Sequence, residues 1–122
     1  MEKHGKFLLV DFENVQKIAD MSKIDGGTKI IVFLGSHQTK LSFDLVSKNQ
    51  KLGSRLEWKQ IEGSGKNAVD MVIAYHMGKA FDKDPQAQCT VLSKDKGFDP
   101  LIEMLKKEGK NCQRIENIAE LK

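Results

Sequence analysis

Short apolar runs alternate with amphipathic stretches along the whole chain, and this alternation predicts strands that alternate with helices. β-branched and aromatic residues dominate the apolar runs, which predict strands at residues 6–11, 29–34, 55–61, 88–93 and 111–115. The run at 55–61 alternates apolar and polar positions, as an edge strand does. Apolar residues at helical spacing predict helices at residues 14–22, 39–50, 67–81 and 98–107. In the second of these helices, Leu41, Leu45 and Val46 form the expected apolar face, with Phe43 as a further candidate.

This order of elements predicts one α/β domain over residues 1–122, a three-layer α/β/α sandwich with a mostly parallel sheet. Crossovers between parallel strands are right-handed. If the first three strands run outward and the fourth returns beside the first, the strand order is 3-2-1-4-5. Ligands then bind between strands 1 and 4, at the carboxyl ends of the strands.

Four carboxylates fall at that place in the predicted fold. Asp11 ends the first strand, Asp70 lies on the first turn of helix 67–81, and Asp95 and Asp99 follow the fourth strand. Like charges a few ångströms apart repel and raise one another's pKa. A hard divalent cation bound through oxygen is the usual compensation. The cluster therefore indicates phosphodiester chemistry.

Each of these acids also has a purely structural interpretation. Asp11 completes an otherwise apolar strand, where an ionised carboxylate needs a partner. Asp70 would be favourable to the helix dipole, although it stands alone among apolar neighbours. Asp99 precedes Pro100 and has the position of a helix N-cap, so capping and metal binding both stay open for it.

Charge and composition add less. A net charge of +3 does not by itself indicate nucleic acid, but lysines spread outside the acidic site are compatible with a phosphate backbone. No apolar run approaches the ~20 residues that span a bilayer, and the first residues lack the features of a signal peptide. Cys89 and Cys112 are expected to be buried free thiols. We therefore expect a cytoplasmic protein.

Three segments resemble the PIN-like superfamily, and specifically its NYN/PIN-like nuclease branch. They are LLVDFENV at 8–15, KNAVDMVIAY at 66–75 and VLSKDKGFDPLIEML at 91–105. The resemblance implies a PIN-like fold and a metal-dependent nuclease, usually one that acts on RNA with Mg²⁺ or Mn²⁺. It makes Asp11, Asp70 and Asp95 the metal-binding acids and Asn14 the residue that orients the first. The pattern commonly has a second Asp where this chain has Gly97, and Asp99 is the candidate replacement.

We therefore predict a ribonuclease that hydrolyses single-stranded RNA by metal-assisted attack of water. Its catalytic and metal-binding residues are Asp11, Asp70, Asp95 and Asp99, and its substrate-binding residues are Asn14, Lys66, Lys94 and Lys96. The expected partner is nucleic acid, with RNA favoured and no membrane. A homodimer and a protein inhibitor or antitoxin stay open.

Two alternatives remain. The domain binds nucleic acid without cutting it, an interpretation that Gly97 favours. Or it is a phosphatase of the haloacid dehalogenase type, with Asp11 as nucleophile and Glu13 as the second acid. Against the latter, the chain leaves no room after Asn14 for the flap of such enzymes. Trp58 is the one aromatic candidate for base stacking, and packing on the edge strand is favoured for it.

Overall fold

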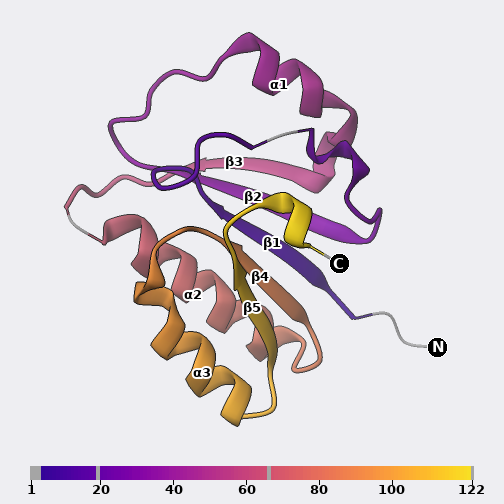
Figure 1. The fold of residues 1–122 in the computed structure, drawn as a ribbon, viewed down its shortest axis with the longest axis vertical. Helices are drawn as coiled ribbons and strands as arrows, with labels where there is room; N and C mark the ends of the chain where they lie inside the picture. Colours follow the sequence, from indigo (N-terminus) through magenta and orange to yellow (C-terminus); the bar gives the residue numbers. More distant parts are fainter. Residues whose placement is uncertain (1–3, 19, 66, 122) are drawn as a thin grey trace.

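The computed structural model of the chain describes residues 4–18, 20–65 and 67–121, which contain one five-stranded sheet (Figure 1). All its strands are parallel, and their order is β3-β2-β1-β4-β5. The predicted α/β class and the predicted strand order are therefore confirmed. The strands are β1 (Lys6–Asp11), β2 (Thr28–Leu34), β3 (Leu56–Gln60), β4 (Gln88–Leu92) and β5 (Asn111–Ile115).

Two helices cover one face of the sheet. They are α2 (Ala68–Lys83) and α3 (Asp99–Lys107), which lie beside each other in Figure 1. On α2, buried apolar residues recur at every fourth position: Val69, Ile73, Met77 and Phe81. This spacing keeps them on one side of the helix, where they join Leu9, Phe33 and Val91 of the sheet in a common core.

The other face has less helix. It is covered by α1 (Phe43–Asn49), by the loop after β1, and by turns of 3₁₀-helix. These turns are η1 (Met21–Lys23), η2 (Gln50–Arg55) and η4 (Ile118–Glu120); a fourth, η3 (Lys96–Phe98), leads into α3. The sandwich is thus asymmetric, with regular helices on one side and mostly irregular chain on the other.

The helix predicted for residues 14–22 is wrong. The carbonyl of Asp11 accepts from the amides of Asn14 and Val15, at 3.1 and 2.9 Å, and this single turn does not continue. Val15, Ile18 and Met21 lie three residues apart and are buried against the sheet. The segment that carries them is nevertheless irregular and not helical. The side chain of Asn49 accepts from the Met21 amide at 2.7 Å and ties this segment to α1.

The helix predicted for residues 39–50 is shorter than expected. Ser42 caps it, since its hydroxyl accepts from the Leu45 amide at 3.1 Å. Leu41 and Leu45 pack on the core as predicted. Phe43 is 86% exposed, however, and Val46 is 37% exposed. The burial of α1 therefore rests on fewer apolar contacts than its sequence indicated.

Two further expectations concern the class of protein. Cys89 and Cys112 are buried and free, as predicted, and they face each other in the register of β4 and β5. The longest helix within the described ranges, α2, has 16 residues, and none there combines the length and apolar character needed to cross a bilayer.

Candidate functional site

Asp11 is the most deeply buried of the predicted acids. It ends the central strand β1, pairs in register with Phe33 of β2, and is only 2% exposed. One carboxylate oxygen, Oδ2, accepts from the hydroxyl of Ser93 at 2.8 Å. The other, Oδ1, is buried without a hydrogen-bond partner among the described residues. Burial raises the pKa of Asp11, although the bond from Ser93 works in the opposite direction.

Asp70 and Asp95 form a coupled pair beside Asp11. Burial raises the pKa of Asp70 to about 7, and a hydrogen bond with Asp95 and the charges of Asp95 and Asp11 act in the same direction. The pKa of Asp95 is lowered, first by the Gly97 amide and then by its bond with Asp70. These shifts favour the protonated form of Asp70 and the ionised form of Asp95. Asp11, Asp70 and Asp95 are therefore near enough to affect one another's pKa values at the carboxyl edge of the sheet.

The loop after β4 holds Asp95 in place. Its Oδ1 accepts from the Gly97 amide at 2.8 Å, so Asp95 also caps the short η3 turn. A Cβ atom on Gly97 would stand 2.9 Å from that same oxygen. The glycine that departs from the family pattern therefore leaves room for the Asp95 carboxylate to fold back over the backbone.

Ser93 and Asn14 join the loops that carry the acids. The Ser93 hydroxyl donates to Asp11 and accepts from the Asp95 amide at 3.0 Å. The Asn14 side chain accepts from the Lys94 amide, also at 3.0 Å. Asn14 therefore ties the loop after β1 to the loop after β4. Sequence reasoning gave Ser93 no role of its own, although it stands in the same motif as Asp95.

Glu13 is a fourth acid near the site. Its charge contributes to the raised pKa of both Asp11 and Asp70. Its side chain lies over Gly35, where a Cβ atom would collide with the Glu13 carboxylate. The sequence analysis considered Glu13 only as the second acid of a phosphatase. The sequence feature that could have placed Glu13 at the site was its position two residues after Asp11.

Asp99 has a different partner. Its carboxylate accepts from Nε and Nη2 of Arg114 at 2.8 and 3.4 Å, and the pKa of Asp99 is lowered by this contact. Arg114 also donates to Glu116 at 2.8 Å and to the Ser93 carbonyl at 3.0 Å. Asp99 makes no capping bond to the start of α3. The structure therefore places Asp99 in an ion-pair cluster with Arg114 and Glu116, which we call the arginine cluster.

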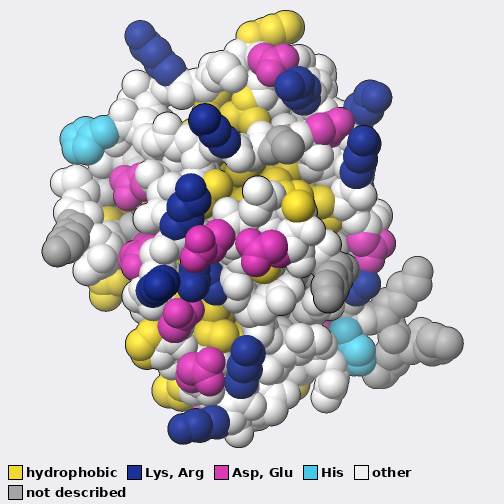
Figure 2. All heavy atoms as spheres, viewed as in Figure 1, with side chains coloured by type: hydrophobic (Ala, Val, Ile, Leu, Met, Phe, Trp, Pro, Cys, Tyr) yellow, Lys and Arg dark blue, Asp and Glu magenta, His cyan; other side chains and the backbone are white. Residues whose placement is uncertain are grey.

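The lysines predicted to bind substrate lie in different parts of the structure. Lys94 is exposed and lines a polar cavity of about 460 Å³ together with Asn14, Lys17 and Asn117. Lys96 is exposed near the arginine cluster, where it lowers the pKa values of Asp99 and Glu116. Lys66 lies outside the described residues. Figure 2 shows acidic and basic side chains intermixed over one face, so a polyanion would depend on individual lysines rather than on a broad basic field.

A divalent cation fits the chemistry of the three acids. Their oxygens are the donors that Mg²⁺ and Mn²⁺ prefer. The partnerless Oδ1 of Asp11 and the raised pKa values of Asp11 and Asp70 indicate a negative site that lacks compensation. In the part of the chain that the structure describes, no three His, Cys, Asp or Glu side chains are grouped closely enough to hold a metal as they stand. Binding would therefore require the carboxylates to turn toward the cation.

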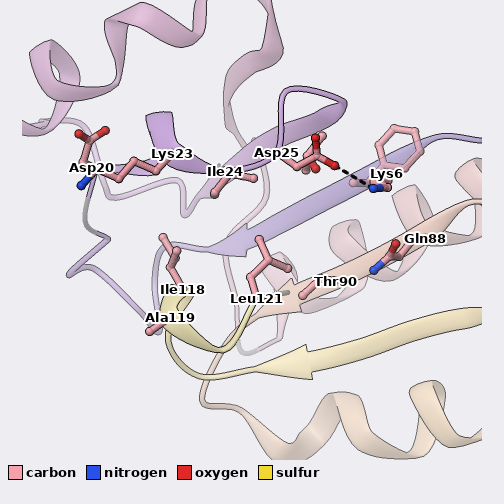
Figure 3. A pocket seen from close by; sticks show the side chains of 12 residues that line it. Lys6, Asp20, Lys23, Ile24, Asp25, Gln88, Thr90, Ile118, Ala119 and Leu121 are labelled. Atoms are coloured by element: carbon pink, nitrogen blue, oxygen red, sulfur yellow. Dashed lines mark hydrogen bonds and ion pairs between the residues drawn. The ribbon is translucent and has the colours of Figure 1, made fainter.

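Two other cavities matter for the location of a site. One of about 340 Å³ lies between α2 and α3 and includes Asp70 and Asp95 in its lining. Another of about 360 Å³ lies where β1 and β4 begin, with Lys6, Gln88 and Leu121 among its lining residues (Figure 3). There Lys6 is paired with Asp25 at 2.8 Å, so the charges balance. The second cavity lies away from the carboxyl edge and has none of the acidic residues described above.

Comparison with known families agrees with this arrangement. A sequence model described as a PIN domain matches residues 5–115, which include every strand of the sheet and the acids Asp11, Glu13, Asp70, Asp95 and Asp99. No curated protein and no solved structure matches the chain significantly.

Proposed function

Because the chain belongs to the PIN domain family, we propose that it is a metal-dependent nuclease that hydrolyses single-stranded RNA at Asp11, Asp70 and Asp95. PIN domains are generally nucleases. The observation that supports the proposal best is the mutual repulsion of carboxylates at one edge of the sheet. Burial and neighbouring acids raise the pKa values of Asp11 and Asp70. This lowers the stability of the fold unless a bound cation offsets it, and such strain is typical of functional sites.

The protein's own residues prepare this site. Ser93 fixes one oxygen of Asp11 and leaves the other available as a ligand. Because the pKa of Asp70 is raised to about 7 while that of Asp95 is lowered, Asp70 is the group that can take up or release a proton near neutral pH. A bound Mg²⁺ or Mn²⁺ would supply charge neutralisation and an acidified water. We propose Asp11, Asp70 and Asp95 as its ligands.

Glu13 is the fourth acid that we assign to this site. Its charge acts on both Asp11 and Asp70, whereas Asp99 is paired with Arg114. For the substrate, Lys94 stands on the rim of the polar cavity beside Asn14, where an ammonium group reaches a phosphate next to the scissile one.

Incubation of labelled single-stranded RNA and DNA with Mn²⁺, Mg²⁺ or EDTA tests the proposal. We expect cleavage of RNA with either metal and none with EDTA. Asp70→Asn should abolish it. Asp82→Asn should not, since it removes the same charge from an exposed position on the same helix. Equal activity of the two variants, or cleavage in EDTA, would contradict the proposed site.

A second candidate function is binding without cleavage. The absence of a preformed group of three ligands in the described residues favours it, as does Gly97. It predicts RNA binding that is the same in Mn²⁺ and in EDTA, with intact RNA recovered in both.

A further inference from the structure

The outer side of α2 carries apolar side chains that the core does not use. Met71 is 73% exposed and Tyr75 is 62% exposed, although the opposite side of the same helix is fully buried. Positions four apart on a helix are neighbours on one face. Met71 directly follows Asp70, so this exposed strip begins at the acidic site.

The strip continues into the cavity between α2 and α3. Met71, Ala74, Phe98 and Leu101 give this cavity its apolar walls, and Asn67, Asp70 and Asp95 add polar groups. Its volume of about 340 Å³ is at the small end of the range for small-molecule sites, which is roughly 300–1,000 Å³. A cavity of this size suits one flat, partly apolar group with polar edges.

Tyr75 is arranged for the same kind of group. The ammonium of Lys79 lies over one face of its ring, 5.2 Å from the ring centre, and the rings of Tyr75 and His76 meet edge to face, so a base would stack on the side of Tyr75 that Lys79 does not cover. An exposed aromatic ring stacks on any nucleobase, and a nearby cation attracts the phosphate that accompanies the base. Met71 and Tyr75 are separated by about 6 Å along the helix axis, from a rise of ~1.5 Å per residue.

We propose that this face of α2 binds two successive unpaired nucleobases, one against the apolar wall that Met71, Ala74 and Leu101 give to the cavity between α2 and α3, and the next on Tyr75. The inference rests on the proposed function, because the strip leads directly to Asp70. Paired bases are stacked inside a duplex and cannot enter the cavity or reach the ring. The face therefore selects single strands, and it assigns to Tyr75, Met71 and Lys79 a role that the sequence analysis did not find.

Binding can be measured without cleavage. The probe is a fluorescein-labelled 12-nucleotide single-stranded RNA, with its duplex as comparison, titrated by anisotropy in EDTA. We expect Tyr75→Ala to weaken binding of the single strand about tenfold, as loss of one stacked base does. Phe43→Ala is the matched control, because Phe43 is an exposed aromatic residue on α1, which packs on the other face of the sheet from α2. It should change nothing.

A direct readout uses the fact that Tyr75 is the only tyrosine of the chain. Incorporation of 3-fluorotyrosine gives one fluorine resonance, which should shift with single-stranded RNA and not with duplex. A resonance that stays fixed while RNA binds, with equal effects of Tyr75→Ala and Phe43→Ala, would overturn the inference and leave the proposed nuclease intact.

The remaining outcomes are also decisive. A shifted resonance together with intact RNA in Mn²⁺ would support the binding face and contradict the nuclease. A resonance that moves with protein concentration in the absence of RNA would show a contact between copies of the chain, and would overturn the inference.

Discussion

Two acidic regions lie close together at the carboxyl edge of the sheet, and their electrostatics are opposite. In the arginine cluster, the pKa values of Asp99 and Glu116 are lowered because Arg114 donates to both. Around Asp11 and Asp70 the pKa values are raised, because burial and other acids disfavour the charged form. The first region is balanced within the chain. In the second, the charge of Arg114 reaches Asp95, but burial and other acids dominate at Asp11 and Asp70.

The difference separates two uses of the same residue type. A carboxylate that meets an arginine stabilises the fold while it is ionised. Carboxylates that meet only one another cost stability, and a fold keeps them where a ligand or a reaction gives them a use. The comparison therefore supports our proposal that the three acids carry out the chemistry while the arginine cluster stabilises the fold, and variants in each region test it.

The largest expected effect is that of Asp11→Asn. We expect activity to fall at least about a hundredfold, since removal of a proposed ligand should exceed the loss from an outer contact. The free energy of unfolding in EDTA should stay the same or rise, because one of the repelling carboxylates is gone. RNA cleavage and thermal melts measure both quantities. A strongly destabilised variant would mean that Asp11 is structural.

The second effect concerns the arginine cluster. Arg114→Met should lower the free energy of unfolding more than a change at an isolated surface cation does, because Asp99, Glu116 and the Ser93 carbonyl all lose a charged donor. Urea denaturation measures the change. Lys107→Met is the control, since it removes a cation from an exposed position on α3. If both variants have the same midpoint, Arg114 is an ordinary surface charge.

A third effect is the dependence of stability on pH. The pKa of Asp70 is about 7 in the folded protein against 3.8 for the unfolded group, so the folded state binds more protons between these values. Stability in EDTA should therefore fall as pH rises from about 5 to 8. Asp70→Asn should flatten this slope. Melting temperatures across that range test it, and Mn²⁺ should raise the wild-type value more at pH 8 than at pH 5.

The smallest effect should come from Asp99→Asn. Because Asp99 is paired with Arg114, we expect RNA cleavage and its requirement for Mn²⁺ to change less than about twofold. Cleavage rates over a series of Mn²⁺ concentrations measure this. A clear increase in the Mn²⁺ needed would instead make Asp99 a member of the metal site, as the sequence analysis proposed.

The sequence predicted the sheet and its order because β1, β2 and β4 are compact apolar runs and β3 alternates apolar and polar positions as an edge strand does. It also predicted that Asp11, Asp70 and Asp95 meet at the carboxyl edge, and in the described residues they are near enough to affect one another's pKa values but not grouped closely enough to hold a metal as they stand. The irregular segment after β1 was missed because Val15, Ile18 and Met21 have the spacing of a helix face while they line a loop. The local sequence pattern cannot distinguish a helix from such a loop, because the difference depends on the surface against which the residues pack.

The partner of Asp99 was outside the reach of local reasoning for another reason. Arg114 lies 15 residues further along the chain, in β5, and its contact depends on how that strand aligns with the start of α3. Glu13 shows the same limit, since its nearness to Asp70 arises only in the folded chain. The metal and the substrate stay predictions.

The hydroxyl of Ser93 connects Asp11 to the loop after β4 through two consecutive hydrogen bonds that run in the same direction. It has a single proton, which it gives to Asp11, while its oxygen receives the amide proton of Asp95. Hydrogen bonds in such a chain polarise one another. A change of charge on Asp11 is therefore communicated to the backbone of the next loop without any movement of either strand. The amide nitrogen of Asp95 becomes a reporter, whose NMR chemical shift follows the state of a carboxylate that it does not touch.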